Sequence, residues 1–408
     1  MALDLTIVRL GAQGDGVAET SDGQLFVSFA LPGERVRVEP AGDGRHARLL
    51  EVLKQSPERV EPICPHFGVC GGCALQHMKP EAYLAWKRDL VTGALKSRGL
   101  DANVEEVRAE PLASRRRATF GLGTDRDGIA LGFHRARSHD LIDIETCPIL
   151  SPRIAARLSG LKAMLAPLSR GRQQLRVGIT ETESGLDVVV EGAQPKETEL
   201  ARLGREAGAL GVARITIGEL SVTLLTPTVR FGRALVSIPP GAFLQASPTA
   251  ESVLTAIVRD GIGKAKRIAD LFAGLGTFSL ALGEVAAVDA YEANETALAA
   301  LAEAARHTPK LKPIRTYPRD LLRDPLGHQE LATYDAVVFD PSRAGAAAQA
   351  EQLAHSKVKR LIAVSCNPGT LARDLRVLVD GGYRLTRVVP IDQFLFSGHI
   401  EVVAHLSR

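Results

Sequence analysis

The residue with the clearest capacity for chemistry is Cys366, which follows a mostly apolar run that begins at Val358. The run ends in Ser-Cys-Asn-Pro-Gly, a sequence that continues neither a strand nor a helix. An apolar run bounded in this way is typical of a strand buried on both faces of a parallel sheet. Cys366 would then lie just beyond the carboxyl end of a strand, where open α/β sheets bind their ligands. A thiol there can act as a nucleophile, although a lone cysteine is more often a small buried hydrophobe.

Four other cysteines form a separate group. Three lie within ten residues among glycines, and the fourth comes much later in a Cys-Pro pair: Cys64, Cys70, Cys73 and Cys147. Four thiolates can hold a tetrahedral zinc ion or an iron–sulfur cluster. The C-x5-C-x2-C spacing is longer than the two-residue knuckles of a zinc ribbon, and it therefore favours iron–sulfur. Disulfides are the remaining alternative, and they are rare in cytoplasmic proteins.

Glycine and acidic residues mark further strand ends in the last third of the chain. A strand over Arg267–Phe272 leads into the glycine turn Ala273–Thr277, the next strand ends at Glu292, and the strand Tyr334–Phe339 ends at Asp340. The glycines let backbone approach a ligand, and an acid about 20 residues further on can accept both ribose hydroxyls. Because the third glycine of the dinucleotide fingerprint is missing, we expect an adenosine ligand without a pyrophosphate.

The elements that must position these residues suggest three domains in an α/β protein. Short strands between glycine turns predict a small β-barrel over residues 1–58. Residues 59–240 read as a β-rich central domain. In residues 241–408, strands alternate with helices, as in a nucleotide-binding α/β sheet. Its first helix is expected over Thr249–Val258, with Ser247 as the N-cap and Pro248 at the first helical position.

Composition limits the class of protein. The chain has 408 residues, 45% of them hydrophobic and 24% charged, and a formal net charge of +3. No apolar stretch is long enough for a membrane helix, and the first residues do not resemble a signal peptide. We therefore expect a soluble, cytoplasmic protein with no membrane partner.

Charge is unevenly distributed along the chain. Residues 1–58 hold six Lys and Arg against nine Asp and Glu, whereas Lys87–Arg176 holds seventeen against ten. Within the basic stretch, Arg115–Arg117 is followed closely by Arg135 and Arg137. Clustered arginines suit phosphate contacts, and RNA is therefore a candidate partner, although a charge run can simply be a solvated face.

Taken together, these motifs resemble the RNA uracil-5-methyltransferases. The resemblance is carried by Cys366 in Ser-Cys-Asn-Pro, Asp340 in Phe-Asp-Pro-Ser-Arg-Ala-Gly, the glycine loop Asp270–Thr277 and the terminal Ser397–Glu401. The N-terminal module looks like the small RNA-binding barrel of this family, the TRAM domain. The four grouped cysteines match the iron–sulfur pattern of the branch that methylates 23S ribosomal RNA. The likeness extends over nearly the whole chain.

The resemblance implies a class I, Rossmann-like methyltransferase domain and a set of functional residues. Cys366 would attack carbon 6 of the uracil, and Glu401 would remove the proton from carbon 5. The four grouped cysteines would hold a [4Fe-4S] cluster. The residues implied to contact S-adenosyl-L-methionine are Gln245, Phe272, Thr277, Glu292, Asp320 and Asp340.

The expected partner is RNA, with 23S ribosomal RNA favoured and transfer RNA as the alternative, and the expected oligomeric state is a monomer. A second alternative is an RNA-binding protein whose methyltransferase fold is inactive, but the presence of Cys366, Asp340 and Glu401 argues against it. A DNA cytosine-5-methyltransferase shares the covalent chemistry, yet its cysteine normally follows a proline in the loop of an earlier strand.

Overall fold

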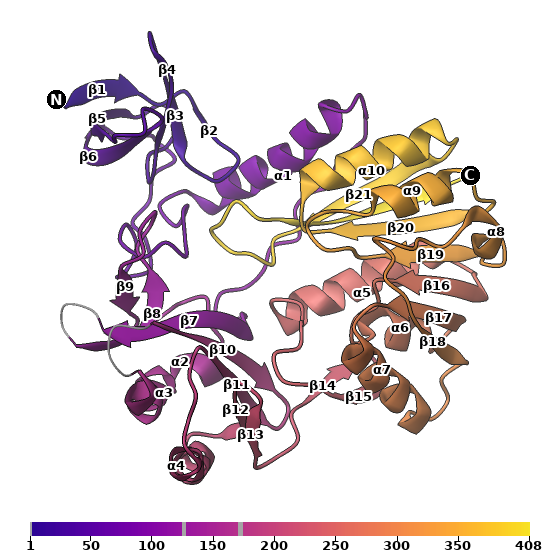
Figure 1. The fold of residues 1–408 in the computed structure, drawn as a ribbon. Helices are drawn as coiled ribbons and strands as arrows, with labels where there is room; N and C mark the ends of the chain where they lie inside the picture. The colour runs from indigo at the N-terminus through magenta and orange to yellow at the C-terminus, as the bar shows by residue number, and fades with distance from the viewer. Residues whose placement is uncertain (1, 125–127, 170–173) are drawn as a thin grey trace.

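The computed structural model describes residues 2–124, 128–169 and 174–408. It contains three large sheets, which follow one another along the chain (Figure 1). No helix in these ranges is long and apolar enough to cross a membrane.

The N-terminal sheet has six strands in the order β1-β5-β6-β4-β3-β2 and encloses a small core of its own. Alternation drives this arrangement, because Val36 and Val38 of β5 face the core while their neighbours face outward. Glu34, also buried, accepts from Arg59 Nε at 2.5 Å and so ties the sheet to the next segment. The strands are β1 (Leu3–Thr6), β2 (Arg9–Leu10), β3 (Gly16–Thr20), β4 (Gly23–Val27), β5 (Arg35–Pro40) and β6 (His46–Lys54).

The central sheet has seven strands in the order β13-β12-β11-β10-β7-β8-β9. Its middle is a hairpin, in which Thr182 pairs with Gly185 at the turn. Inward-facing valines and isoleucines of β10 to β12 pack with the helices α3 and α4. The elements of this region are β7 (Arg117–Thr124), β8 (Ile129–His134), β9 (Leu141–Asp143), α2 (Pro152–Ala155), α3 (Leu158–Leu165), a 3₁₀ turn (Ala166–Leu168), β10 (Leu175–Thr182), β11 (Gly185–Glu191), α4 (Glu197–Ala209), β12 (Val212–Ile217), β13 (Leu220–Thr223) and the separate pair β14 (Thr228–Phe231) and β15 (Ala234–Ser237).

The C-terminal sheet has seven strands in the order β18-β17-β16-β19-β20-β22-β21. The first five are parallel, and β22 runs antiparallel to both of its neighbours. The order reverses between β16 and β19, and such a switch point is where open α/β sheets bind ligands. The elements are α5 (Pro248–Ile262), β16 (Arg267–Leu271), α6 (Thr277–Leu282), β17 (Ala287–Glu292), α7 (Glu295–His307), β18 (Ile314–Pro318), α8 (His328–Leu331), β19 (Ala336–Phe339), α9 (Ala347–Ala354), β20 (Arg360–Ser365), α10 (Pro368–Asp380), β21 (Arg384–Ile391) and β22 (Glu401–Ser407).

Helix α1 (Pro80–Lys96) lies far from the C-terminal sheet in the sequence but packs beside it in space (Figure 1). Val91 and Leu95 of α1 share a core with Leu375 of α10. Further along, Val104 forms a parallel bridge with Val388 of β21. The C-terminal sheet is therefore covered on this side by a segment from the first quarter of the chain.

Candidate active site

The chain turns sharply immediately after Cys366, and this turn leaves the half-buried thiol at the edge of the C-terminal sheet. Asn367 is the N-cap of α10, and its Oδ1 accepts from the backbone N–H of Gly369 at 3.0 Å. Pro368 occupies the first helical position, where its missing N–H costs nothing. Asn367 Nδ2 also donates to the carbonyl of Arg343 at 3.2 Å, which ties this turn to the loop after β19.

Glu401 begins β22 and reaches the same edge as Cys366. Because β22 is antiparallel to β20, Val402 pairs with Ser365 and the start of one strand lies beside the end of the other. The Glu401 side chain is buried, and its Oε2 accepts from Gln393 Nε2 at 2.5 Å. Its other oxygen, Oε1, is buried without a hydrogen-bond partner. Burial, followed by the negative charge of Asp340, raises the pKa of Glu401 well above its usual range.

A chain of side-chain amides joins Glu401 to Asp340. Gln393 Nε2 donates to Gln245 Oε1 at 2.9 Å, and Gln245 Nε2 donates to Asp340 Oδ2 at 3.3 Å. Gln393 Oε1 accepts from the backbone N–H of Ala246 at 3.0 Å. Gln393 was not among the residues predicted from the sequence, because its role depends on contacts with Gln245 and Glu401. The two amides fix each other's orientation, because each has a distinct donor and acceptor.

Two carboxyl groups lie at the switch point, the buried Asp270 and the partly buried Asp340. Asp340 has its pKa raised to about 7, mainly by burial and then by the charge of Asp270. The pKa of Asp270 is likewise raised to about 7 by burial, although Ser279 Oγ donates to it at 2.5 Å. Burial also raises the pKa of the Cys366 thiol, and the charges of Glu401 and Asp340 add to this effect. This edge of the sheet is therefore rich in groups that can hold a proton near neutral pH.

The glycine turn after β16 is held against the end of β17. Glu292 Oε2 accepts from Gly274 N at 2.9 Å, and Glu292 Oε1 accepts from Asn294 N at 2.8 Å. Phe272 has a φ of 63°, a conformation that is strained for a side chain of this size. Each carboxylate oxygen keeps a free lone pair, so Glu292 can still accept from further hydroxyl groups.

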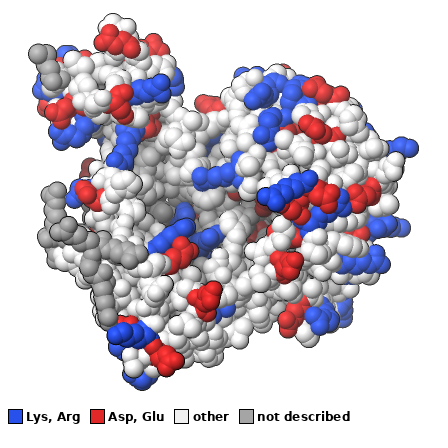
Figure 2. Space-filling model, in the orientation of Figure 1, with Lys and Arg blue, Asp and Glu red and all other residues white. Residues whose placement is uncertain are grey.

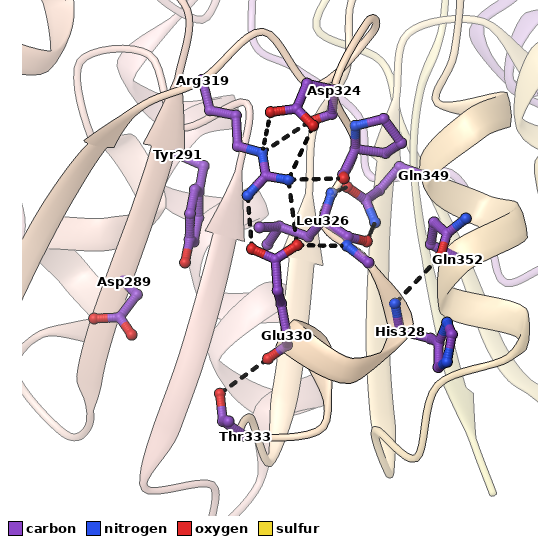
Figure 3. Close-up of polar contacts among 12 residues, drawn as sticks. Asp289, Tyr291, Arg319, Asp324, Leu326, His328, Glu330, Thr333, Gln349 and Gln352 are labelled. Atoms are coloured by element: carbon purple, nitrogen blue, oxygen red, sulfur yellow. Dashed lines mark hydrogen bonds and ion pairs between the residues drawn. The ribbon is translucent and has the colours of Figure 1, made fainter.

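Asp320 lies on the loop after β18, next to the end of β17. Arg319 holds this loop, with Nη1 donating to Glu330 Oε1 at 2.7 Å and Nε to the carbonyl of Asp324 at 2.9 Å (Figure 3). The backbone N–H of Arg319 donates to the carbonyl of Glu292 at 2.9 Å. The side chain of Asp320 is 44% exposed, and one of its oxygens accepts from a backbone N–H within its own loop.

The structure thus places the expected residues in two groups and one separate position. One group holds Cys366, Glu401, Asp340 and Gln245, around the ends of β19, β20 and β22. The other holds Phe272, Glu292 and Asp320, at the ends of β16 to β18. Thr277 begins α6 and lines an open groove of about 930 Å³ between α5 and the central domain.

The side chains of the arginine run Arg115–Arg117 form contacts with other groups of the same chain. Arg116 is 6% exposed and forms an ion pair with Glu251 of α5, while Arg117 Nη1 donates to the carbonyl of Leu244 at 3.2 Å. The prediction of a phosphate contact is therefore wrong for Arg116. Its partner is 135 residues away in the sequence, beyond the reach of any local count of charges.

The four grouped cysteines line one cavity of about 270 Å³, together with His66 and Arg115. All four are free thiols, so the disulfide alternative is not formed in this structure. Burial, with a smaller contribution from the neighbouring thiols, raises the pKa of Cys73 to about 12. Within the described ranges, no group of three or more His, Cys, Asp or Glu side chains is arranged to hold a single metal ion.

Comparison with known proteins identifies the family. A family model described as tRNA (uracil-5-)-methyltransferase matches residues 240–408. A protein of Chromohalobacter salexigens, named 23S rRNA (uracil(1939)-C(5))-methyltransferase RlmD, is 37% identical over 429 residues, covering 99% of this chain and 89% of its own. The chain belongs to the RNA uracil-5-methyltransferase family. It is an enzyme of this class.

Two further proteins are similar to this chain, one in sequence and one in fold. A protein of Brucella suis biovar 1, named an uncharacterized RNA methyltransferase, is 49% identical over 406 residues, covering 99% of this chain and 97% of its own. The structure of a Pyrococcus abyssi tRNA (uracil-54, C5)-methyltransferase in complex with S-adenosyl-L-homocysteine has a TM-score of 0.76 and 22% identity, and 99% of each chain is covered. The expected α/β fold class, with a Rossmann-like domain after a β-rich N-terminal region, is confirmed.

Proposed function

We propose that this uracil-5-methyltransferase transfers a methyl group from S-adenosyl-L-methionine to carbon 5 of a uridine in 23S ribosomal RNA, through a covalent intermediate on Cys366. The observation that carries the proposal is the convergence of a thiol and a buried carboxyl group on adjacent antiparallel strands. Covalent activation of a uracil needs both groups at one site.

The chemistry explains why both are needed. Carbon 5 of uracil is a poor nucleophile until the thiolate of Cys366 forms a bond to carbon 6, which leaves an enolate. When bound, S-adenosyl-L-methionine supplies the methyl group that carbon 5 then takes. Glu401 removes the remaining proton from carbon 5. The electrons of that C–H bond form the C5=C6 double bond, and the Sγ–C6 bond breaks with its electron pair returning to sulfur.

The neighbours of Glu401 and Cys366 alter the proton affinities of both groups. A raised pKa makes the Glu401 carboxylate a strong base once it has lost its proton. Cys366 must ionise to act as a nucleophile, and the nearby Arg343 cation partly offsets the rise in the pKa of its thiol that burial, Glu401 and Asp340 cause. Arg343 Nη2 lies 3.3 Å from His399 Nε2, so this guanidinium is held between the loop after β19 and the segment that leads to Glu401.

The residues at the ends of β16 to β19 fit S-adenosyl-L-methionine. Glu292 would accept the ribose hydroxyls with its free lone pairs, and the turn that begins at Phe272 would bring backbone close to the ligand. Asp320 would face the adenine. Gln245 and Asp340 would lie toward the reacting methyl group, between the cofactor and the uracil, and Thr277 is proposed as a further contact.

The choice of 23S ribosomal RNA rests on the relative RlmD, which is named for that substrate. Transfer RNA is the second candidate because the matching family model is described by it. Figure 2 shows a face of the molecule that is hollowed between the N-terminal and C-terminal parts, with Lys and Arg side chains on its walls. Such a surface suits an RNA whose target base has left its stack. Mapping of 5-methyluridine in both RNAs from a deletion strain would decide between them.

Two variants test the mechanism. Cys366→Ala should abolish methyl transfer while S-adenosyl-L-methionine binding stays close to that of the wild type. Glu401→Gln keeps the shape of the site but removes the base, so it should accumulate an RNA adduct that survives denaturing electrophoresis. Normal turnover by the alanine variant would refute the covalent mechanism.

We further propose that the four grouped cysteines hold a [4Fe-4S] cluster. The fit rests on four thiols around one cavity of about 270 Å³, with the Arg115 guanidinium beside them to balance negative charge. Burial and the neighbouring thiols raise the pKa of Cys70, Cys73 and Cys147, and a bound cation would reverse this. Protein purified without oxygen should be brown and contain about four iron atoms per chain, and Cys147→Ser should lose both properties. A colourless protein with stoichiometric zinc would overturn the assignment.

A further inference from the structure

Lys87 of α1 is fully buried, and its ammonium group donates hydrogen bonds to one loop of the C-terminal domain. Its Nζ pairs with Asp392 Oδ1 at 2.7 Å, and neither side chain is exposed. It also donates to the carbonyl of Phe394 at 3.3 Å and to the carbonyl of His399. An ammonium group has three hydrogens to donate, so one acceptor is available for each.

These acceptors are the two ends of the loop that joins β21 to β22, residues 392–400. Asp392 and Phe394 lie at its beginning and His399 near its end, two residues before the first residue of β22. Lys87 therefore holds the two ends of the 392–400 loop together. Within this loop Gln393 bonds to Glu401, and the loop leads directly into Glu401 itself.

The middle of the 392–400 loop is also held from outside the C-terminal domain. The backbone N–H of Ala74 donates to the carbonyl of Phe396 at 2.7 Å, and the N–H of Phe396 donates to Tyr83 Oη at 2.8 Å. Gly398 approaches the backbone of Ala12 so closely that a Cβ would lie 2.5 Å from its carbonyl oxygen. Figure 1 shows the loop between β21 and β22 reaching out from the sheet toward the N-terminal half.

We propose that Lys87 is a positioning residue for methyl transfer, which fixes both ends of the 392–400 loop and thereby sets Gln393 and Glu401 against Cys366. The inference rests on the proposed role of Glu401 as the base for the carbon 5 proton. Because that proton leaves after the methyl group has arrived, a loosened loop slows release of the covalent intermediate more than its formation.

The test must separate positioning from simple neutralisation of a buried charge. Lys87→Met leaves Asp392 unpaired in the interior and should be strongly destabilised. The double variant Lys87→Met/Asp392→Asn removes both charges but does not restore the bonds to the loop carbonyls. Arg214→Met, which breaks the buried ion pair with Asp187 in the central sheet, is the matched control for loss of stability alone.

The full-length proteins would be assayed with unmodified 23S ribosomal RNA transcript or, if the wild type methylates that instead, with tRNA transcripts. For the double variant we expect a melting temperature near that of the wild type. We expect kcat to fall by roughly 100-fold, the cost of about a 1 Å misplacement, with little change in KM for RNA. The covalent adduct should accumulate during turnover, and Arg214→Met should show no such accumulation.

The outcomes distinguish this inference from the proposed function. If Glu401→Gln traps an adduct and the double variant turns over like the wild type, or turns over slowly without an adduct, Lys87 is not a positioning residue for this step. If Glu401→Gln itself traps no adduct, the proposed role of Glu401 fails first. If the double variant has both normal kcat and normal stability, Lys87 serves only to neutralise the charge of Asp392.

Discussion

Replacing Asp340 by asparagine should change how the stability of the protein depends on pH. The Asp340 side chain is partly buried, and its pKa is raised from 3.8 to about 7 by desolvation and by the charge of Asp270. An acid with a raised pKa in the folded state contributes stability that is fully present below 3.8 and is lost as the pH rises to about 7. Asparagine has no charge to bury and keeps an acceptor for Gln245 Nε2.

The magnitude follows from the interval between the two values. Between pH 5 and pH 7 the free energy of unfolding of the wild type should fall by ~2.7 kcal/mol more than that of the variant. This corresponds to ~1.4 kcal/mol for each pH unit. In a domain of this size, a free energy of 1 kcal/mol moves Tm by about 2–4 °C. The difference in Tm between Asp340→Asn and the wild type should therefore shift by about 5–10 °C in favour of the variant as the pH rises from 5 to 7.

The assay is thermal unfolding of both proteins from pH 5 to pH 8, together with methyl transfer, which the variant should lose. Asp335→Asn is the control, because the pKa of Asp335 is lowered by hydrogen bonds from the backbone N–H groups of Lys266 and Arg267. That carboxyl group stays ionised throughout the range, so its variant should run parallel to the wild type. If Asp340→Asn also runs parallel, the carboxyl group of Asp340 does not have a raised pKa.

Three further substitutions test the supports of the site. Arg116→Met breaks the buried ion pair with Glu251 and should cost about 3–5 kcal/mol, most of which Glu251→Leu in the same chain should restore. Gly276→Ala places a Cβ against Leu301 at a φ of 87° and should cost about 1–3 kcal/mol, with weakened S-adenosyl-L-methionine binding. Asn367→Ala removes the cap of α10 and should cost ~1 kcal/mol, with a larger loss of kcat.

Denaturant unfolding and calorimetric titration with S-adenosyl-L-methionine measure these effects. An Arg116→Met protein as stable as the wild type would mean that the central domain does not support α5 through this ion pair. If Gly276→Ala binds S-adenosyl-L-methionine as tightly as the wild type does, the close packing of the glycine turn is not required for cofactor binding. If the kcat loss in Asn367→Ala, expressed as a free energy, is no larger than its loss in free energy of unfolding, the cap stabilises α10 but does not contribute to catalysis.

Much of the C-terminal fold was readable from local patterns. The Ser247 cap and Pro248 predicted the start of α5, and Ser247 does accept from the backbone N–H of Ala250. The apolar run before Cys366 predicted β20, which ends at Ser365 as expected. These signals are local, because a cap, a proline or a continuous apolar run acts on its immediate neighbours.

The amino-acid sequence by itself determined which residues carry chemistry: a thiol after a buried strand, acids at neighbouring strand ends and four grouped cysteines. Only the tertiary structure decided what surrounds them. The antiparallel pairing of β22 with β20 brings Glu401 to the edge that holds Cys366, and Gln393 joins it to Gln245 and Asp340. Lys87 reaches the same loop from 305 residues away. Burial and partners of this kind depend on contacts between distant segments, and these contacts set the proton affinities on which the reaction depends.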